Sequence, residues 1–556
     1  MEQFRVRTRR ELVQDLLTGC VIGLLSIPLS MGYAQVAGLP ARCGLYGSLF
    51  TVLAFGLASG SPRYVFCVDA APAALAGMLL PTLGIAAGSA EAASFLPVFT
   101  LMTACWLFLF WLLRGGNYAK FISEPVLGGC VTGIACIVML GILPRLFGGE
   151  AATGRAPALL GHLFGELGRF HLLSFVLGSA TVVLVLALRD RTRMSVSVVI
   201  MAAAIPAGMV LDWEGLGVRV VEPFPGGLPR PSGFDFSWLA RHTEAIVVDS
   251  LAVALVIAAE TLVSCRALAR EYGEETDGQR EMLAYAGANL VAALFGSSPA
   301  IGSISRTRLA NLRGVHSQWM SVSACLTLAL FLLFATPLLR CLPVPVMTGI
   351  VVASLISIME FGMAGRLWVL ERSEFFIFAG AFAAELIGLA EGVLAGLVLS
   401  FVSFTMRSSR QPRYFLGVLR GEEGFHDLAQ HPGARPIART VLYQFNGALF
   451  FANAEDMEHD ILDALREDTA LVVVMGISSV DMFAAERLLD LYRLLKRRGI
   501  RLYLCGHVGV VREQLISYGA KEMIREGAVR RRLTQALAAG GIVPPYELGT
   551  REKAKK

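Results

Sequence analysis

The sequence predicts a polytopic α-helical membrane protein built from two related halves and followed by a soluble α/β domain. Of the 556 residues, 55% are hydrophobic and only 17% are charged, whereas soluble domains carry about 25% charged residues. Apolar runs of the roughly 20 residues that a helix needs to cross a bilayer recur from residue 13 to about residue 406. Two apolar regions are broken by short stretches of glycine, proline and serine. Together these features indicate about twelve full spans and two half-helices.

Basic residues flank the membrane region at both ends. Residues 4–10 (FRVRTRR) precede the first span, and residues 406–414 (MRSSRQPRY) follow the last. Because positive flanks stay in the cytoplasm, both termini are predicted to be cytoplasmic and the number of crossings to be even. Residues 189–193 mark a cytoplasmic loop by the same rule. We therefore expect an integral protein of the plasma membrane, which in a bacterium is the inner membrane, in contact with membrane lipid.

The first span, residues 13–36, contains Pro28 within a polar run, SIPLSMGYAQVAGLP. One interpretation is a proline kink whose serines bond back to the helix. The other places Ser30, Tyr33 and Gln35 beside a substrate cavity. The other segments of this half are interpreted as scaffold, and residues 212–241, rich in proline and glycine, as the connection to the second half.

Residues 293–314 (ALFGSSPAIGSISRTRLANLRG) cannot cross lipid as a plain helix. Irregular backbone at membrane depth survives only inside protein or beside water, because its polar groups need partners. We expect unwound chain over residues 296–302 and a short helix from about Ile301 to near Gly314. The N-terminus of such a helix carries unpaired N–H groups and the positive end of the helix dipole, which can bind an anion.

A matching break occurs in the first half, at residues 60–77 (GSPRYVFCVDAAPAALAG). With the halves starting near residues 13 and 244, Asp69 and Ala300 are equivalent, as expected for repeats that place two half-helices at one site. Two roles for Asp69 are open. It caps the half-helix, or it is protonated and so does not repel an anion.

The second half-helix carries two arginines. Arg306 is predicted to attract the anion, with hydroxyl groups from Ser303 and Ser305 beside it; the alternative is that Arg306 ties the half-helix to neighbouring carbonyl groups. Arg308, two residues further round the helix, is expected to point elsewhere.

Glu260 lies deep in the apolar span of residues 244–269, and Ser264 follows one turn later on the same face. An ionisable side chain at membrane depth is costly and indicates function. We interpret Glu260 as a titrating carboxylate that binds a proton and is linked to the anion site, since removal from water favours the neutral form of a carboxyl group. The alternative is a structural partner for Arg306. Glu385 and Glu391, in contrast, fall near a predicted helix start and are expected to be solvated or capping.

The composition after residue 406 is that of a soluble domain. Residues 442–453, 471–478 and 501–507 have the pattern of strands, and helical patterns follow at residues 454–466, 484–498 and 508–518. Alternating strands and helices predict a small α/β sheet.

Several function classes are disfavoured. The ten cysteines form no C-x-x-C pair, so neither a disulfide framework nor a metal site is expected. We find no metal-ligand cluster, nucleophile motif or nucleotide loop, so the chain is predicted not to be an enzyme and to need no cofactor. The net charge of +5 fits the basic flanks of a membrane protein and needs no nucleic acid to explain it.

Three motifs resemble the SulP/SLC26 family of anion transporters: residues 15–47 (DLLTGCVIGLLSIPLSMGYAQVAGLPARCGLYG), 60–63 (GSPR) and 288–314 (ANLVAALFGSSPAIGSISRTRLANLRG). The resemblance covers nearly the whole chain. It implies a 7+7 inverted-repeat, UraA/SLC26-like transporter with core and gate domains. Many relatives carry Gly-Pro immediately before position 69, where Cys67 and Val68 stand here.

The predicted site combines these motifs. The substrate-binding residues are predicted to be Tyr33, Gln35, Asp69, Ala70, Ala71, Ala300, Ile301, Gly302, Ser303, Ser305 and Arg306, and the ion-coupling residues Glu260 and Ser264. The resemblance implies secondary active transport of a small anion, C4-dicarboxylate, sulfate or bicarbonate, by symport with H⁺ or Na⁺ and by elevator-type alternating access. The alternative is an anion channel or a membrane sensor that signals through its C-terminal domain.

The C-terminal domain resembles the family's STAS domain. The expected organisation is a cytoplasmic N-terminus (1–12), a transport domain (13–406, with repeats at 13–211 and 244–406), a linker (407–436), the STAS domain (437–540) and a flexible tail (541–556). The loop that carries a phosphorylated serine in some relatives reads Asp481-Met482-Phe483-Ala484 here, without a hydroxyl group. A homodimer and a cytosolic protein partner of this domain are further expectations from the resemblance.

Overall fold

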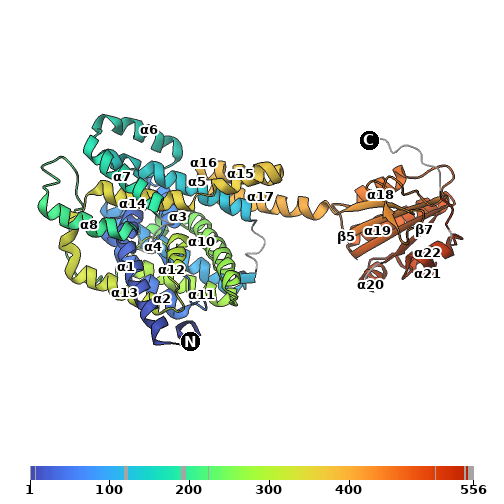
Figure 1. Ribbon diagram of the computed structural model, residues 1–556, viewed down its shortest axis with the longest axis horizontal. Coiled ribbons are helices and arrows are strands. Elements are labelled where there is room, and N and C mark those ends of the chain that lie inside the picture. Colours follow the sequence, from blue (N-terminus) through green and yellow to red (C-terminus); the bar gives the residue numbers. More distant parts are fainter. Residues whose placement is uncertain are drawn as a thin grey trace. The chain divides into compact units, whose positions relative to one another are not determined.

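The computed structural model describes residues 2–6, 8–117, 123–188, 196–222, 224–506, 509–543 and 546–548. Contacts divide the chain into two compact units, Met1–Ser403 and Phe404–Lys556 (Figure 1). The predicted cytoplasmic loop at residues 189–193, His507 of the predicted third strand, and most of the predicted tail lie outside the described residues.

The helices of the first half follow one another with short connections. They are η1 (Glu2–Phe4), α1 (Arg9–Val36), α2 (Ala41–Ala58), α3 (Ala70–Thr82), α4 (Ala90–Leu112), η2 (Gly115–Asn117), α5 (Glu124–Ile142), η4 (Leu143–Phe147), α6 (Ala156–Glu166), η5 (Leu167–Arg169), α7 (Leu172–Leu188) and α8 (Val196–Val210). The second half contains α9 (Ser237–Arg241), α10 (Thr243–Tyr272), α11 (Gly278–Leu294), α12 (Ile304–Leu312), α13 (Trp319–Leu330), η6 (Phe331–Ala335), η7 (Thr336–Cys341), α14 (Val344–Ile358), α15 (Phe361–Leu370), α16 (Arg372–Ile387) and α17 (Leu389–Ser409).

Seven helical stretches among the described residues are long and apolar enough to cross a membrane: Arg9–Val36, Ala41–Ala58, Ala90–Leu112, Glu124–Phe147, Thr243–Tyr272, Trp319–Cys341 and Val344–Leu370. Three shorter apolar helices are α3, α7 and α8. The number of full-length stretches is smaller than predicted because several apolar runs form short helices. One example is α16, which has 16 residues and ends at its C-cap residue, Gly388.

The two predicted half-helices are α3, with 13 residues, and α12, with 9 residues. The chain before each is extended, and the two extended segments pair with one another: β1 (Phe66–Cys67) is antiparallel to β2 (Ile301–Gly302). A further bond joins the Ser303 amide to the Val65 carbonyl oxygen at 2.8 Å. This pairing satisfies backbone groups of both breaks, which lipid could not do.

The second half-helix begins later than predicted. Its first helical residue is Ile304 and its N-cap position is Ser303, whereas the expected start was Ile301. Ile301 and Gly302 belong to β2, so pairing with the first half keeps them extended. The residue at the α12 start that corresponds to Asp69 is therefore Ser303 rather than Ala300.

Glycines allow close contact between α5 and α16. A Cβ atom on Gly129 would lie 2.4 Å from the Phe378 carbonyl oxygen, and one on Gly133 would lie 2.9 Å from Cβ of Glu385. Gly349 of α14 is likewise close to α7, where its Cβ would lie 2.8 Å from the Gly178 carbonyl oxygen. The absence of a side chain at Gly349 therefore allows α14 and α7 to pack closely.

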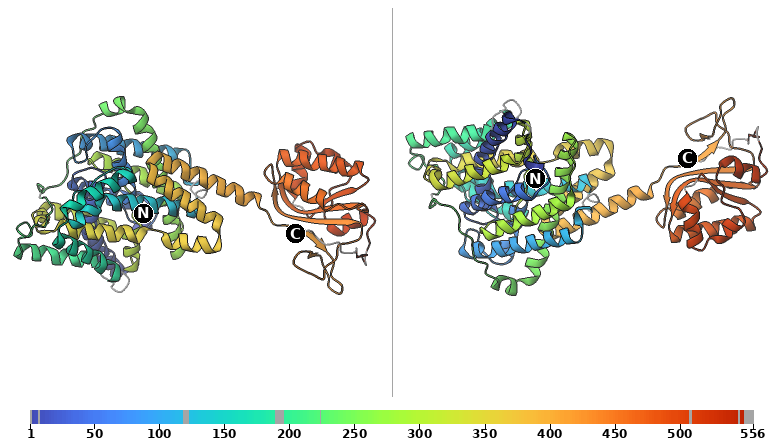
Figure 2. Two further views of the ribbon diagram at one scale, coloured as in Figure 1. Left: turned by 90° about the horizontal axis from the view of Figure 1, so that it is seen from above. Right: turned by 90° about the horizontal axis from the view of Figure 1, so that it is seen from below.

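The second unit contains a five-stranded sheet of order β4-β3-β5-β6-β7, with β5, β6 and β7 parallel and β3 and β4 antiparallel (Figure 2). Its elements are β3 (Arg413–Gly417), β4 (His426–Asp427), β5 (Thr440–Leu449), α18 (Ala454–Asp463), β6 (Leu471–Val480), α19 (Met482–Arg497), β7 (Arg501–Cys505), α20 (Gly509–Ser517), α21 (Lys521–Arg525) and α22 (Leu533–Ala539). Alternate residues of β6 face opposite sides. Val472 and Val474 belong to the core beneath α18 and α19, and Val473 packs with Leu537 of α22.

The strands and helices predicted for this domain are present, but its sheet begins earlier than expected. Residues 413–417 lie in the predicted linker and form β3, which pairs with β5 from Arg413↔Phe445 to Leu416↔Leu442. The short apolar run YFLG follows a basic, proline-containing flank, so the sequence pattern did not predict a strand here. Only pairing with a distant strand makes it part of the sheet.

Candidate functional site

The start of α3 is fixed by Asp69. This residue has extended backbone (φ −142°), and its carboxylate accepts a hydrogen bond from the Ala70 amide at 2.7 Å. The predicted capping role of Asp69 is therefore confirmed. The small residues that follow, including Ala70 and Ala71, leave the first turn of the helix open to a neighbouring group.

The start of α12 is fixed from outside the helix. Asn289 of α11 forms hydrogen bonds with both backbone polar groups of Ala300. Its Oδ1 accepts from the Ala300 amide at 2.8 Å, and its Nδ2 donates to the Ala300 carbonyl oxygen at 3.1 Å. The Gly302 amide donates to Oγ1 of Thr261 at 3.2 Å. Ser303 occupies the N-cap position without a capping bond from its side chain, and its hydroxyl oxygen lies 3.4 Å from that of Ser305.

A small cavity of about 10 Å³ lies where the two helix starts meet, large enough for about one water molecule. It is lined by Asp69, Ala70, Ala71, Val131, Ile134, Glu260, Ile301, Gly302, Ile304, Ser305 and Ile358. These residues come from α3, α5, α10, α12, β2 and the end of α14, so both halves of the chain contribute. Seven of the predicted site residues meet here: Asp69, Ala70, Ala71, Glu260, Ile301, Gly302 and Ser305.

Arg306 is completely buried and does not line this cavity. Its Nη1 donates to the Val68 carbonyl oxygen at 2.9 Å and to Sγ of Cys67, and it lies 3.9 Å from Oδ2 of Asp69. Its Nη2 lies 3.4 Å from Oγ of Ser30. The guanidinium group therefore joins the second half-helix to the strand that precedes the first one, and its charge is balanced by Asp69.

Glu260 projects into the cavity wall, and its Oε2 has no hydrogen-bond partner in the described part of the chain. Only 6% of the residue is exposed. Ser264, one turn later, is held in a different way. Its hydroxyl donates to the Glu260 carbonyl oxygen at 2.6 Å and lies 2.5 Å from the Tyr64 hydroxyl. Ser264 faces a larger neighbouring cavity rather than the small one.

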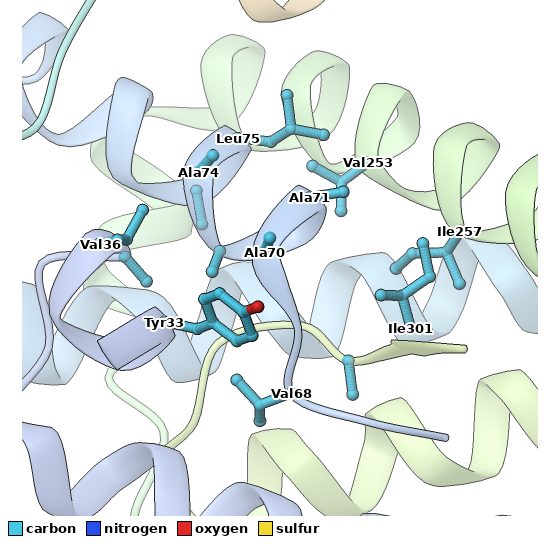
Figure 3. Packing of buried hydrophobic residues seen from close by; sticks show 14 of the residues in the cluster. Tyr33, Val36, Val68, Ala70, Ala71, Ala74, Leu75, Val253, Ile257 and Ile301 are labelled. Atoms are coloured by element: carbon cyan, nitrogen blue, oxygen red, sulfur yellow. The ribbon is translucent and has the colours of Figure 1, made fainter. Parts of the chain in front are cut away.

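Tyr33 and Gln35 have different surroundings although they are two residues apart. Tyr33 packs among residues at the α3 start, beside Val68 and Ala70 (Figure 3), and lies within electrostatic range of Asp69. The side chain of Gln35 instead accepts a hydrogen bond from Arg145 in η4. Neither residue lines the small cavity.

Two larger cavities adjoin the small one. One, of about 510 Å³, lies between Tyr64, α10 and α12, and the other, of about 140 Å³, lies between α1, α7, α8, α12 and α14. Ile304 lines all three cavities, and Ser305 lines the small and the 140 Å³ cavity. Arg308 lines both larger cavities, so it faces open space beside the site.

The described residues contain no group of three or more His, Cys, Asp or Glu side chains able to hold a metal ion. What the site offers a ligand is the N–H groups and positive dipole ends of two helices, a few hydroxyl groups, and one carboxyl group in the wall. Such a site suits a small anion rather than an apolar or nucleotide ligand.

Residues 12–381 match the sulfate permease family, and residues 429–536 match the STAS domain. The chain belongs to the sulfate permease (SulP) family. The SulP chain is 28% identical, over 97% of its length and 97% of the relative's, to a probable sulfate transporter of Mycobacterium tuberculosis. It is 24% identical to the chloroplastic sulfate transporter 4.1 of Arabidopsis thaliana, over 91% of this chain and 78% of that protein.

Solved structures share the fold of this SulP chain. Murine Solute Carrier 26 family member A9, an anion transporter in the inward-facing state, superposes with a TM-score of 0.83 at 18% identity, over 96% of this chain and 92% of that chain. The transmembrane domain of the cyanobacterial bicarbonate transporter BicA superposes with a TM-score of 0.61 at 16% identity, over 71% and 98%. The SulP protein is therefore a polytopic helical transporter with a C-terminal STAS domain, and its class is anion transport rather than enzyme catalysis.

Four residues that shape the site were not predicted from the sequence: Tyr64, Thr261, Asn289 and Ser354. Tyr64, Thr261 and Ser354 act on residues far away in the chain; the Ser354 hydroxyl, for example, lies 3.4 Å from that of Ser305. For Asn289 there was a usable signal, because an amide side chain in an apolar helix needs buried partners. The other three carried no such signal.

Proposed function

We propose that this SulP protein is a secondary active transporter that carries a small oxyanion, with sulfate as the first candidate and bicarbonate and C4-dicarboxylates as alternatives. The observation that carries the proposal is the meeting of the α3 and α12 N-termini, one from each half, at a single buried cavity. The description of the family and the names of its relatives favour sulfate among the candidates.

The anion would be held mainly by backbone N–H groups and helix dipoles. The charge of Arg306 is balanced by Asp69 at 3.9 Å, so neither residue gives the site a net charge. The positive ends of the α3 and α12 helix dipoles then supply the positive electrostatic potential at the site. In this proposal Arg306 holds the two helix starts in register, and Ser305, which lines the cavity, supplies a hydroxyl group to the anion. Ser303, whose hydroxyl lies 3.4 Å from that of Ser305, supports it from behind.

Coupling to a cation is assigned to Glu260. Its unpartnered oxygen lines the same cavity as the anion-binding backbone, so a bound H⁺ or Na⁺ would remove a charge that repels the anion. Cation and anion would therefore bind together, which is the requirement for symport. The side chain of Ser264 is engaged with Tyr64, so its contribution is to orient α10 rather than to hold the cation.

Transport would follow an elevator-type movement of the two half-helices, α1 and α10 against the remaining helices. The small cavity is too tight for sulfate as it stands, and the route to the two larger cavities passes Ile304. The proposal includes a homodimer in the plasma membrane of a bacterium, with cytoplasmic termini as the basic flanks indicate. In this proposed orientation, the two larger cavities face the cytoplasm.

The test is uptake of labelled sulfate by the purified protein in proteoliposomes, with bicarbonate, fumarate, succinate and chloride as competitors. We expect saturable uptake, counterflow, and stimulation by an inward gradient of H⁺ or Na⁺. Uptake that does not saturate and shows no counterflow would instead identify a channel. Absence of any anion flux would favour a sensor that signals through the STAS domain.

Glu260→Gln is the decisive variant. It should abolish the dependence of uptake on the cation gradient while sulfate exchange continues, because the anion site is intact and the titrating group is gone. Glu244→Gln, at the exposed first turn of the same helix, is the matched control and should behave as the wild type. An unchanged gradient dependence in Glu260→Gln would remove Glu260 from the coupling role.

A further inference from the structure

Glu385 is a second carboxyl group buried in the membrane unit. It lies in the last turn of α16, and none of its surface is exposed. From the sequence, Glu385 and Glu391 were both expected to be solvated or to cap a helix. The structure contradicts this for Glu385, and the side chain of Glu391 lies outside the described part. Glu385 lies on the face of α16 that packs against α5. Gly133 of α5 leaves room there for the Cβ atom of Glu385.

Neither carboxyl oxygen of Glu385 has a hydrogen-bond partner of normal geometry among the described residues. Glu374, on the same face of α16, shows the contrast. It is also buried, but one of its oxygens accepts a hydrogen bond from the Ser403 hydroxyl at 2.9 Å. A buried ionised carboxylate without partners is strongly disfavoured, whereas one that binds a proton carries no charge.

The group that faces Glu385 from α5 is the Cys130 thiol, which interacts with it electrostatically. From α17, Gly396 lies against the same sulfur atom. No Lys, Arg or His in the described part of the chain neutralises Glu385. With one carboxyl group and one soft sulfur atom nearby, the surroundings lack the several oxygen ligands that a hard metal cation needs, but they suit a proton.

Helix α5 connects Glu385 to the anion site. Cys130 of this helix faces Glu385, and Val131, the next residue of α5, lines the small cavity together with Glu260. Helix α5 thus borders both the Glu385 side chain and the cavity that Glu260 lines.

We propose that Glu385 is a second proton-binding site within the membrane, connected to the cavity of Glu260 through helix α5. The proposal rests on the coupling role proposed for Glu260 and extends it: the membrane unit then holds two buried carboxyl groups that bind a proton, one in the cavity wall and one packed against α5. The pH dependence of transport then reports on two groups rather than one.

Infrared difference spectra of the purified full-length protein, recorded over a pH titration, test this without any transport step. A protonated carboxyl group has its own C=O stretching band. We expect Glu385→Gln to remove one titrating band and Glu260→Gln to leave that band in place. Glu374→Gln, the matched control, should leave the Glu385 band and its titration unchanged.

Cys130→Ala tests the assignment of the band to Glu385 with both carboxyl groups intact. It should shift the frequency of the Glu385 band, because the thiol that faces the carboxyl group is lost. Glu385→Asp is the second variant in case Glu385→Gln does not fold, and it should move the band rather than remove it. A spectrum of Glu385→Gln equal to that of the wild type, or a band unaffected by Cys130→Ala, would overturn the proposal.

Sulfate uptake in proteoliposomes adds a second readout. Glu385→Gln should shift the pH at which uptake is half-maximal, and Glu374→Gln should not. If the wild type takes up no sulfate, the proposed function fails while the infrared result still decides whether Glu385 binds a proton. The two failures are therefore distinguishable.

Discussion

The starts of the two half-helices, α3 and α12, meet at one cavity but are stabilised in different ways. Asp69 caps α3 with its own carboxylate, whereas α12 has no side-chain cap and is held by Asn289 and Thr261 from other helices. The charges also differ, because the first half supplies an acid and the second supplies Arg306. The comparison teaches that the two halves complete each other: each repeat carries one member of a buried ion pair.

Removal of Arg306 should disturb the pairing of the two half-helices more than any other single change. Arg306→Gln leaves Asp69 buried without its counter-charge and removes the bond to the Val68 carbonyl oxygen. Breaking a buried ion pair from one side typically costs about 3–5 kcal/mol. We expect loss of sulfate uptake together with a clearly lower unfolding temperature of the purified protein.

Two further variants sharpen the interpretation of Arg306. Arg308→Gln, on the same helix but exposed, should leave the unfolding temperature near that of the wild type. The double variant Asp69→Asn/Arg306→Gln should recover part of the lost stability, because no unpaired charge remains. If the double variant is as unstable as the sum of the single changes, the two residues are not a coupled pair.

Asn289→Ala tests the external support of α12. It leaves the amide and carbonyl groups of Ala300 without their partners, and each unsatisfied buried group costs about 1–3 kcal/mol. The extended segment before α12 should then lose its fixed position, which raises the KM for sulfate more than it lowers the maximal rate. An unchanged KM would show that this support does not position the anion site.

Ile304→Trp tests the route between the cavities. Ile304 lines all three cavities, so a larger side chain narrows the route without removing a polar group of the site. We expect a lower rate of sulfate exchange with little change in unfolding temperature. Leu312→Trp, which lies in the two larger cavities only, is the control and should have a smaller effect.

The smallest effect on stability is expected when an exposed ion pair in the STAS domain is broken. This pair contrasts with the buried pair Asp69–Arg306. Hydrogen bonds from Lys496 and Tyr492 lower the pKa of Glu526 below its ordinary value of 4.5. The stabilisation is therefore present at neutral pH and is lost as the pH falls through the lowered pKa. Lys496→Met should lower the unfolding temperature only slightly at neutral pH.

Acidic solution provides the control for this last prediction. Below the lowered pKa, Glu526 is protonated in both proteins, so Lys496→Met and the wild type should unfold at the same temperature. Lys521→Met, an exposed lysine of the same domain, should have no pH-dependent effect. A difference that persists in acid would mean that Lys496 stabilises the domain through packing rather than through Glu526.

Much of the fold could be predicted because its signals are local. The positions of the two breaks follow from glycine, proline and serine in apolar surroundings, and the capping role of Asp69 follows from its place before an alanine-rich run. The strands β5 and β6 follow from short runs of branched and aromatic residues. In each case the physical preference belongs to a few neighbouring residues, so no distant contact is needed to recognise it.

The errors have the opposite character. The start of α12 was misplaced by three residues because β2 pairs with β1, which is more than 230 residues away in the sequence. Strand β3 was missed because its partner is β5, and Glu385 was taken for a solvated residue although α5 buries it. Arg306 was predicted to attract the anion, but its donors turn to Cys67 and Val68 rather than to the cavity.

By itself, the sequence determined the class of the protein, the two interrupted helices and the presence of an acid and a base near them. The tertiary structure decided which backbone groups face the cavity, which charges neutralise each other and which carboxyl groups remain unpartnered. The physical reason is that helix propensity and hydrophobicity are properties of short segments. Burial, pairing and electrostatic compensation, in contrast, arise only when segments from both halves of the chain come together.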